Sequence, residues 1–235
     1  MALPKLETPK YTLEVPSTGQ SVEYRPFLVK EEKVLLVAQE SDDNKTMMKA
    51  MGDIIDSCTF GNLNIKSITN FDLEYIFLKL RSKSVGEISE ILLSCTECDT
   101  KNEVKINLDE IEIKVPKDKD KKIMLTGDVG ITLKYISALD VTRLSSYDDD
   151  QSKLINETVL STIENIFDKD NVYDMNDSSS KEKEEFINSL NRQQMEKIEN
   201  FISEAPRLKK EISFTCKSCK TKNKMTLEGT EAFFE

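Results

Sequence analysis

Nearly the same nine letters occur twice in this chain, and each copy carries a Cys-x-x-Cys pair. Residues 94–102 read SCTECDTKN and residues 215–223 read TCKSCKTKN, so the copies share both cysteines and the following Thr-Lys-Asn at identical offsets. A Cys-x-x-Cys turn places two thiolates on one side of the chain, and zinc binds four ligands in a tetrahedron. Because the chain contains no histidine, the two cysteine pairs are the simplest way to complete such a site.

We therefore predict one structural zinc ion that joins the two copies across a pseudo-twofold axis, with these ligands: Cys95, Cys98, Cys216 and Cys219. The 117 residues between the two pairs far exceed the roughly 15–20 of a common zinc ribbon, so the alternative of two turns with free thiols stays open. A closed four-cysteine site has no position for water or substrate, which makes its role structural. We expect the fifth cysteine, Cys58, to be a buried, inert thiol.

Hydrophobic periodicity predicts a similar order of elements in both halves of the chain. Helical spacing predicts helices over 29–41, 43–60, 70–84 and 151–170, and over 181–206 as two segments. Alternation predicts strands over 21–29 and 103–116 and on both sides of each cysteine pair. A further strand is predicted to begin at residue 130 and to lead into a helix that ends at 144. Residues 171–180 are polar and are expected to form a loop.

These elements predict an α+β fold with two similar halves, each a strand, a helical cluster and a zinc-ribbon-like Cys-x-x-Cys β-hairpin. The predicted segments are an extended N-terminal arm at 1–20, a first repeat at 21–116, a linker at 117–127 and a second repeat at 128–235. An internal duplication accounts for this order and makes Cys95 equivalent to Cys216 and Tyr24 to Tyr135. The alternative is two unrelated α+β segments that share a cysteine turn by chance.

The charge of the chain argues against two classes of partner. Its 235 residues include 43 acidic and 33 basic side chains, a net charge of −10. An acidic surface repels phosphate backbones and anionic lipids, so we expect neither nucleic acid nor membrane as a partner. The sequence contains neither the roughly 20-residue apolar stretch of a membrane helix nor the apolar segment of a secretory signal. We expect a reducing cytosol, where paired cysteines indicate metal more than a disulfide.

The composition also argues against catalysis. The absence of histidine removes the commonest general base and the Ser-His and Cys-His nucleophile pairs. The chain has 7 glycines, and neither the dinucleotide-binding pattern nor the P-loop pattern occurs. Neither cysteine pair opens a helix after a buried strand, as a thioredoxin-like redox pair would. We therefore predict no enzymatic activity and no small-molecule substrate.

Both ends of the chain are candidates for contact with a partner. Phe233 and Phe234 form an aromatic pair close to the C-terminus. Such a pair either docks into a partner or packs back onto its own fold, and we take both residues as candidate partner-binding residues with packing back as the alternative. The extended arm at 1–20 is also suited to add as a strand to a neighbouring protein.

Two long strings in the first third of the chain, YRPFLVKEEK (24–33) and FDLEYIFLKLRSKSVG (71–86), resemble the baseplate hub subunit family of T-even-type contractile-tailed bacteriophages. The resemblance is close over residues 1–115 and looser beyond them. It implies a non-enzymatic structural or assembly component of the baseplate hub, present in the host cytoplasm during assembly and in the virion tail baseplate.

The partners implied by this resemblance are other phage tail and baseplate hub proteins, with the tape-measure protein as a further candidate. The alternative function is a transient tail-assembly chaperone for hub or tape-measure proteins that is absent from the mature virion. The family brings no catalytic residues to this chain, in agreement with the composition.

Overall fold

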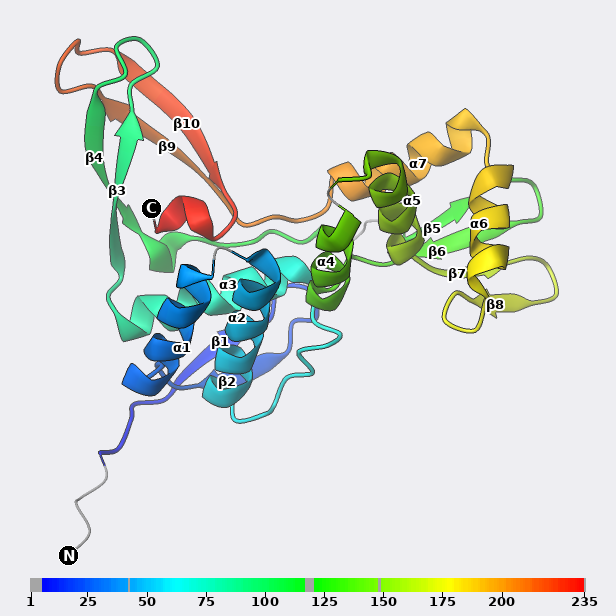
Figure 1. Ribbon diagram of the computed structural model, residues 1–235, viewed down its shortest axis with the longest axis horizontal. Helices are drawn as coiled ribbons and strands as arrows, with labels where there is room; N and C mark the ends of the chain where they lie inside the picture. Colours follow the sequence, from blue (N-terminus) through cyan, green and yellow to red (C-terminus); the bar gives the residue numbers. More distant parts are fainter. Residues whose placement is uncertain (1–5, 42, 117–120, 148, 235) are drawn as a thin grey trace, which may run out of the picture. The chain divides into compact units, whose positions relative to one another are not determined.

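The computed structural model describes residues 6–41, 43–116, 121–147 and 149–234 (Figure 1). Within these residues the fold is α+β, as predicted, with seven α-helices and four small antiparallel sheets. The chain divides into two compact units, one made of Met1–Val115 with Pro206–Glu235 and the other of Pro116–Ala205. We call them the first and the second unit.

The first unit begins with a short hairpin and three helices. These elements are β1 (Tyr11–Glu14), β2 (Ser21–Tyr24), α1 (Val29–Glu40), α2 (Asn44–Cys58) and α3 (Asn70–Ser84). The three helices lie where the periodicity predicts them. Thr69 accepts the N–H of Asp72 and so caps α3, and Asn70 is the first residue inside the helix.

Part of the segment expected to be an extended arm is folded into the first unit. β1 pairs antiparallel with β2, and Leu13 and Val15 are buried. Beyond the strand, the N–H of Ser17 donates to Oδ1 of Asp72 at 2.9 Å, and this carboxylate is completely buried at the start of α3. Pairing, apolar burial and a buried hydrogen bond therefore hold this stretch in place; residues 1–5 lie outside the described residues.

Two longer hairpins complete the first unit and lie side by side in Figure 1. They are β3 (Ile88–Ser94) with β4 (Lys101–Asn107), and β9 (Lys209–Thr215) with β10 (Lys222–Glu228). Their apolar faces share one core with α3, which includes Leu78, Ile91, Ile106, Ile212, Leu227 and Phe233. Residues 206–235 thus pack with the first unit, whereas the sequence analysis grouped them with residues 128–205.

The second unit contains a four-stranded antiparallel sheet and four helices. The sheet has the order β5 (Lys122–Met124), β6 (Gly130–Leu133), β7 (Ile163–Phe167) and β8 (Val172–Asp174). The helices are α4 (Ala138–Leu144), α5 (Gln151–Thr162), α6 (Ser180–Ser189) and α7 (Arg192–Ser203). Within the described residues, no helix is both long enough and apolar enough to cross a bilayer.

Several predicted elements are wrong at their ends, and tertiary contacts explain why. The helix predicted over 151–170 ends at Thr162, because the residues that follow pair as β7 between β6 and β8. Gly130 makes this pairing possible, since a Cβ there would lie 2.4 Å from the ring of Phe167. The strand predicted over 103–116 ends at Asn107, and the loop predicted over 171–180 includes β8.

A buried ion pair fixes the start of α1 to the rest of the first unit. Arg25 Nη2 lies 2.8 Å from Glu31 Oε1, with the two side chains 11% and 7% exposed. The hydroxyl of Ser57 on α2 bridges the pair, at 3.0 and 3.1 Å. Burial acts to raise the pKa of Glu31, but the hydrogen bonds from Arg25 and from the N–H of Leu28 lower it to about 2.

Replacing Arg25 with Met is expected to lower the free energy of unfolding by about 3 kcal/mol, because it leaves the buried Glu31 carboxylate with only the exposed Lys30 ammonium, 3.2 Å away, as a cation. In the wild-type protein the pair stabilises above about pH 4.3, where an unfolded glutamate is ionised. This contribution is lost as the pH falls towards about 2, the folded pKa of Glu31, and Arg25→Met reduces that part of the pH dependence, since the N–H of Leu28 and the ammonium of Lys30 remain. Urea denaturation measured across this pH range checks both expectations.

Lys10→Met is the matched control, because Lys10 pairs with Glu23 on the surface with side chains 58% and 50% exposed. An exposed pair contributes about 0–1 kcal/mol, so this variant should differ little from the wild type. Equal effects of the two substitutions would show that the Arg25–Glu31 pair does not hold α1.

Candidate metal centre

Each cysteine pair lies in the turn of a long hairpin, and the two turns repeat the same backbone hydrogen bonds. In the first turn, the N–H of Cys95 donates to the carbonyl of Thr100 at 3.0 Å, and that of Asp99 donates to Cys95 at 3.0 Å. The second turn repeats both bonds at the equivalent positions, at 2.9 and 3.1 Å. Asp99 and its counterpart Lys220 have φ angles of 53° and 63°. The repeated letters therefore fold twice into one turn.

The two turns bring all four predicted ligand cysteines together. Their sulfur atoms lie within 4.8 Å of one another, and each hairpin supplies one buried and one exposed thiol. Cys98 Sγ lies 3.6 Å from Cys216 Sγ and 3.4 Å from Cys219 Sγ. Four sulfurs about 2.3 Å from a tetrahedral zinc ion are separated by about 3.8 Å. All four are free thiols, so the spacing fits a metal centre.

Hydrogen bonds and burial shift the pKa values of Cys95, Cys216 and Cys219. The N–H of Glu97 lowers the pKa of Cys95. Burial acts to raise the pKa of Cys216, but backbone N–H groups bring it to about 6, which favours the thiolate that binds metals. Thr221 acts to lower the pKa of Cys219, yet hydrogen bonds with the thiols of Cys98 and Cys95, together with burial, raise it overall. A cation between the sulfurs would favour the thiolate form of Cys219.

The fifth cysteine is separate from this centre. Cys58 ends α2 and is completely buried. Burial raises the pKa of its thiol to about 11, so the thiol stays protonated at neutral pH. The expectation that this thiol is buried is confirmed, and its inertness stays a prediction.

Two asparagines that were not predicted as site residues contact the centre. Asn223 is buried; its Oδ1 accepts the N–H of Thr96 at 2.9 Å, and its Nδ2 lies 3.5 Å from the sulfur of Cys95. Asn102 makes the equivalent contacts with the other hairpin. Its Oδ1 accepts the N–H of Lys217 at 2.8 Å, and its Nδ2 lies 3.8 Å from the sulfur of Cys216. Their identical position after each cysteine pair was the signal that could have revealed them.

The C-terminal aromatic pair packs back onto the first unit. Phe233 is completely buried, and its carbonyl accepts the hydroxyl of Ser89 at 2.5 Å. The half-buried ring of Phe234 lies edge-on to Phe77, and the guanidinium of Arg81 lies 4.2 Å from its centroid. This packing favours the alternative given for the tail. Partner binding by the two residues stays a prediction that requires the tail to move.

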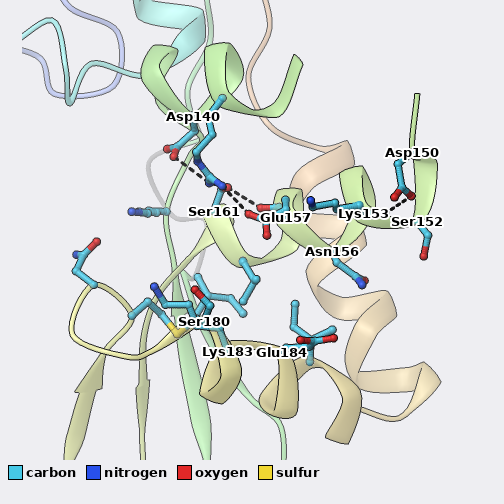
Figure 2. Close-up of a pocket in the computed structure, with 17 residues that line it drawn as sticks. Asp140, Asp150, Ser152, Lys153, Asn156, Glu157, Ser161, Ser180, Lys183 and Glu184 are labelled. Carbon is cyan, nitrogen blue, oxygen red and sulfur yellow. Dashed lines mark hydrogen bonds and ion pairs between the residues drawn. The ribbon is translucent and has the colours of Figure 1, made fainter. Parts of the chain in front are cut away.

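The second unit contains a polar cavity of about 580 Å³ between α4, α5 and α6 (Figure 2). Four basic and four acidic residues line the cavity, so their charges cancel. They are Lys134, Arg143, Lys153 and Lys183, and Asp140, Asp150, Glu157 and Glu184. Arg143 bridges Glu157 at 2.5 Å and the hydroxyl of Ser161 at 2.7 Å. Because its charges cancel and no cysteine lines it, the cavity is a weaker candidate site than the sulfur cluster.

Phe233→Ala is expected to lower the free energy of unfolding by about 3–5 kcal/mol, because it leaves a cavity in the shared core of the two hairpins. Phe234→Ala should cost clearly less, since that ring is only half-buried. Urea denaturation of both variants provides the comparison. A small effect of Phe233→Ala would mean that the tail does not pack into this core.

Comparisons with known proteins agree with the resemblance of the N-terminal strings and extend it over the second half. A family model described as "T4 bacteriophage base plate protein" matches residues 8–235. The baseplate hub assembly protein gp26 of Enterobacteria phage T4 is 24% identical over 228 residues, which cover 96% of this chain and 98% of that protein. No solved structure matches significantly. This chain belongs to the family of T4 bacteriophage base plate proteins.

Proposed function

We propose that this protein is a non-enzymatic structural or assembly component of a phage baseplate hub, acting through protein–protein contacts and stabilised by one structural zinc ion. The match to a baseplate hub assembly protein along nearly the whole chain carries the first part of the proposal. Its place is then the host cytoplasm during assembly and the tail baseplate of the virion. Its partners are other tail and hub proteins, the tape-measure protein included.

The geometry of the sulfur cluster supports the zinc ion. Four thiolates form a donor set that zinc favours, and the separations of 3.4–3.6 Å approach those of a tetrahedral site. Four protein ligands leave no position for a substrate, so the ion would be structural. It would join Cys95 and Cys98 on one hairpin to Cys216 and Cys219 on the other, and so hold the two ends of the first unit together.

The two hairpins also support a local duplication. Each has two strands of 7 residues, the same turn and the same Cys-x-x-Cys. We extend this to the whole zinc-ribbon-like repeat as a proposal, with Tyr24 equivalent to Tyr135. The elements between the hairpins do not support that extension, because the first half has three helices where the second has a four-stranded sheet with helices.

An apolar surface on α1 supports the role of protein contacts. Large apolar side chains from Leu28 to Val37 are 42–67% exposed, and they are Leu28, Val29, Val34, Leu36 and Val37. Several large apolar side chains exposed along one helix favour a surface that binds another protein. The buried ion pair of Arg25 with Glu31, which lies in the first turn of α1, holds this helix in place.

The purified protein is expected to contain one zinc ion per chain. Removing zinc with a chelator, or replacing Cys98 with Ser, should lower the melting temperature, because metal binding to a structural site is coupled to folding. Elemental analysis and thermal denaturation measure the two effects. Cys58→Ala is the control, since this cysteine lies outside the cluster and its loss should leave the zinc content unchanged. A folded, metal-free protein that is insensitive to the chelator would contradict the zinc site.

The name of the T4 relative, an assembly protein, also favours the second candidate, a transient chaperone for hub or tape-measure proteins. Quantitative mass spectrometry of infectious particles and of baseplate-assembly intermediates separates the two. Stoichiometric peptides in both preparations are expected for a permanent hub component. Peptides in the intermediates alone would establish the chaperone, and their absence from both would contradict either function.

A further inference from the structure

We propose that Asn102 and Asn223 are the positioning residues of the metal centre, each holding the first cysteine of the opposite hairpin. The inference rests on the proposed zinc site and adds the groups that orient its ligands. Both side chains are buried, at 4% and 3% exposure, beside the sulfur cluster. Each contacts the hairpin that it does not belong to.

Every polar group of the Asn223 side chain is used. Its Oδ1 accepts the N–H and the hydroxyl of Thr96, both at 2.9 Å. Its Nδ2 donates to the carbonyl of Thr221 at 3.1 Å and to the sulfur of Cys95 at 3.5 Å. A buried amide with all its hydrogen bonds made has one favourable orientation, because rotating it would leave buried groups unpaired.

Asn102 makes the same bonds from the other side of the pseudo-twofold axis. Its Oδ1 accepts the N–H of Lys217 at 2.8 Å, and its Nδ2 donates to the carbonyl of Thr100 at 2.6 Å and to the sulfur of Cys216 at 3.8 Å. The position equivalent to Thr96 is a lysine, so Asn102 accepts no hydroxyl. Asn223 is therefore the more firmly held of the two.

Among the described residues, the two exposed sulfurs contact threonine hydroxyls and no asparagine amide. The thiol of Cys98 lies 3.2 Å from the hydroxyl of Thr100, and that of Cys219 lies 3.3 Å from the hydroxyl of Thr221. Each exposed cysteine is thus held by the threonine of its own hairpin, and each buried cysteine by the asparagine of the other hairpin. This division of contacts explains why Thr-Lys-Asn follows both cysteine pairs.

The chemistry of the centre favours an amide at these positions. Four thiolates around a divalent cation carry a net charge of −2, and N–H donors directed at sulfur offset that charge. An aspartate of the same shape would present only acceptors to the thiolate and repel it. Because the amides cross between hairpins, they also align the sulfurs of both hairpins before a metal ion binds.

Asn102→Asp and Asn223→Asp in the full-length protein test this inference, with titration by Zn²⁺ against a chelating dye and by Co²⁺ followed spectroscopically. We expect about 10- to 100-fold weaker metal binding, the usual loss when a partner of a metal ligand is removed, and the larger loss for Asn223→Asp. The sulfur-to-cobalt charge-transfer band should move to lower energy. Asn188→Asp, an exposed site on α6, adds the same charge elsewhere and should change neither measurement.

The outcomes separate this inference from the zinc site on which it rests. A wild-type protein that binds neither metal ion refutes both. Wild-type binding that the two aspartate variants retain, with an unchanged cobalt band, refutes only the role of the asparagines. Thr96→Val keeps the inference testable if those variants do not fold, since Thr96 is exposed and the change removes only its hydroxyl. It should weaken binding several-fold, and unchanged binding would contradict the inference.

Discussion

The meeting of four thiols at the tips of two hairpins is the interaction on which the first unit depends. Thiolates this close repel one another, so the arrangement needs a cation or directed hydrogen bonds to be stable. The structure supplies the hydrogen bonds from two buried amides and places an apolar core beneath them. One hairpin precedes residue 108 and the other follows residue 208. Their contact therefore packs the C-terminal segment of the chain against the N-terminal part of the first unit.

In the sequence, the second unit lies between these two hairpins, and it has a hydrophobic core of its own. Ile131, Leu133 and Ile198 are completely buried within it, and Tyr135 stacks on Phe201 with ring centroids 5.3 Å apart. The stability of this unit therefore rests on contacts other than the sulfur cluster. We expect loss of metal to act first on the docking of the two hairpins, and the second unit to keep its own hydrophobic core.

A role in baseplate assembly is consistent with how the molecule distributes its groups. Two buried carboxylates take part in structural bonds: Glu31 pairs with Arg25, and Asp72 accepts from Ser17. The polar cavity of the second unit has balanced charges, and the four thiols of the sulfur cluster would together fill the coordination of a tetrahedral metal ion. The exposed apolar surface of α1 remains as a feature suited to another protein, which is what a member of the base plate family requires.

The sequence by itself determined the features that depend on local pattern. Helical spacing located α1 to α3, and the repeated cysteine pairs identified the four thiols that meet. Tertiary structure decided what depends on distant partners. Ile163–Phe167 became a strand because β6 and β8 pair with it, residues 206–235 joined the first unit because their apolar face matches the other hairpin, and each asparagine gained its role from a sulfur of the opposite hairpin. A hydrogen bond or a buried contact between two different elements leaves no periodicity in either segment.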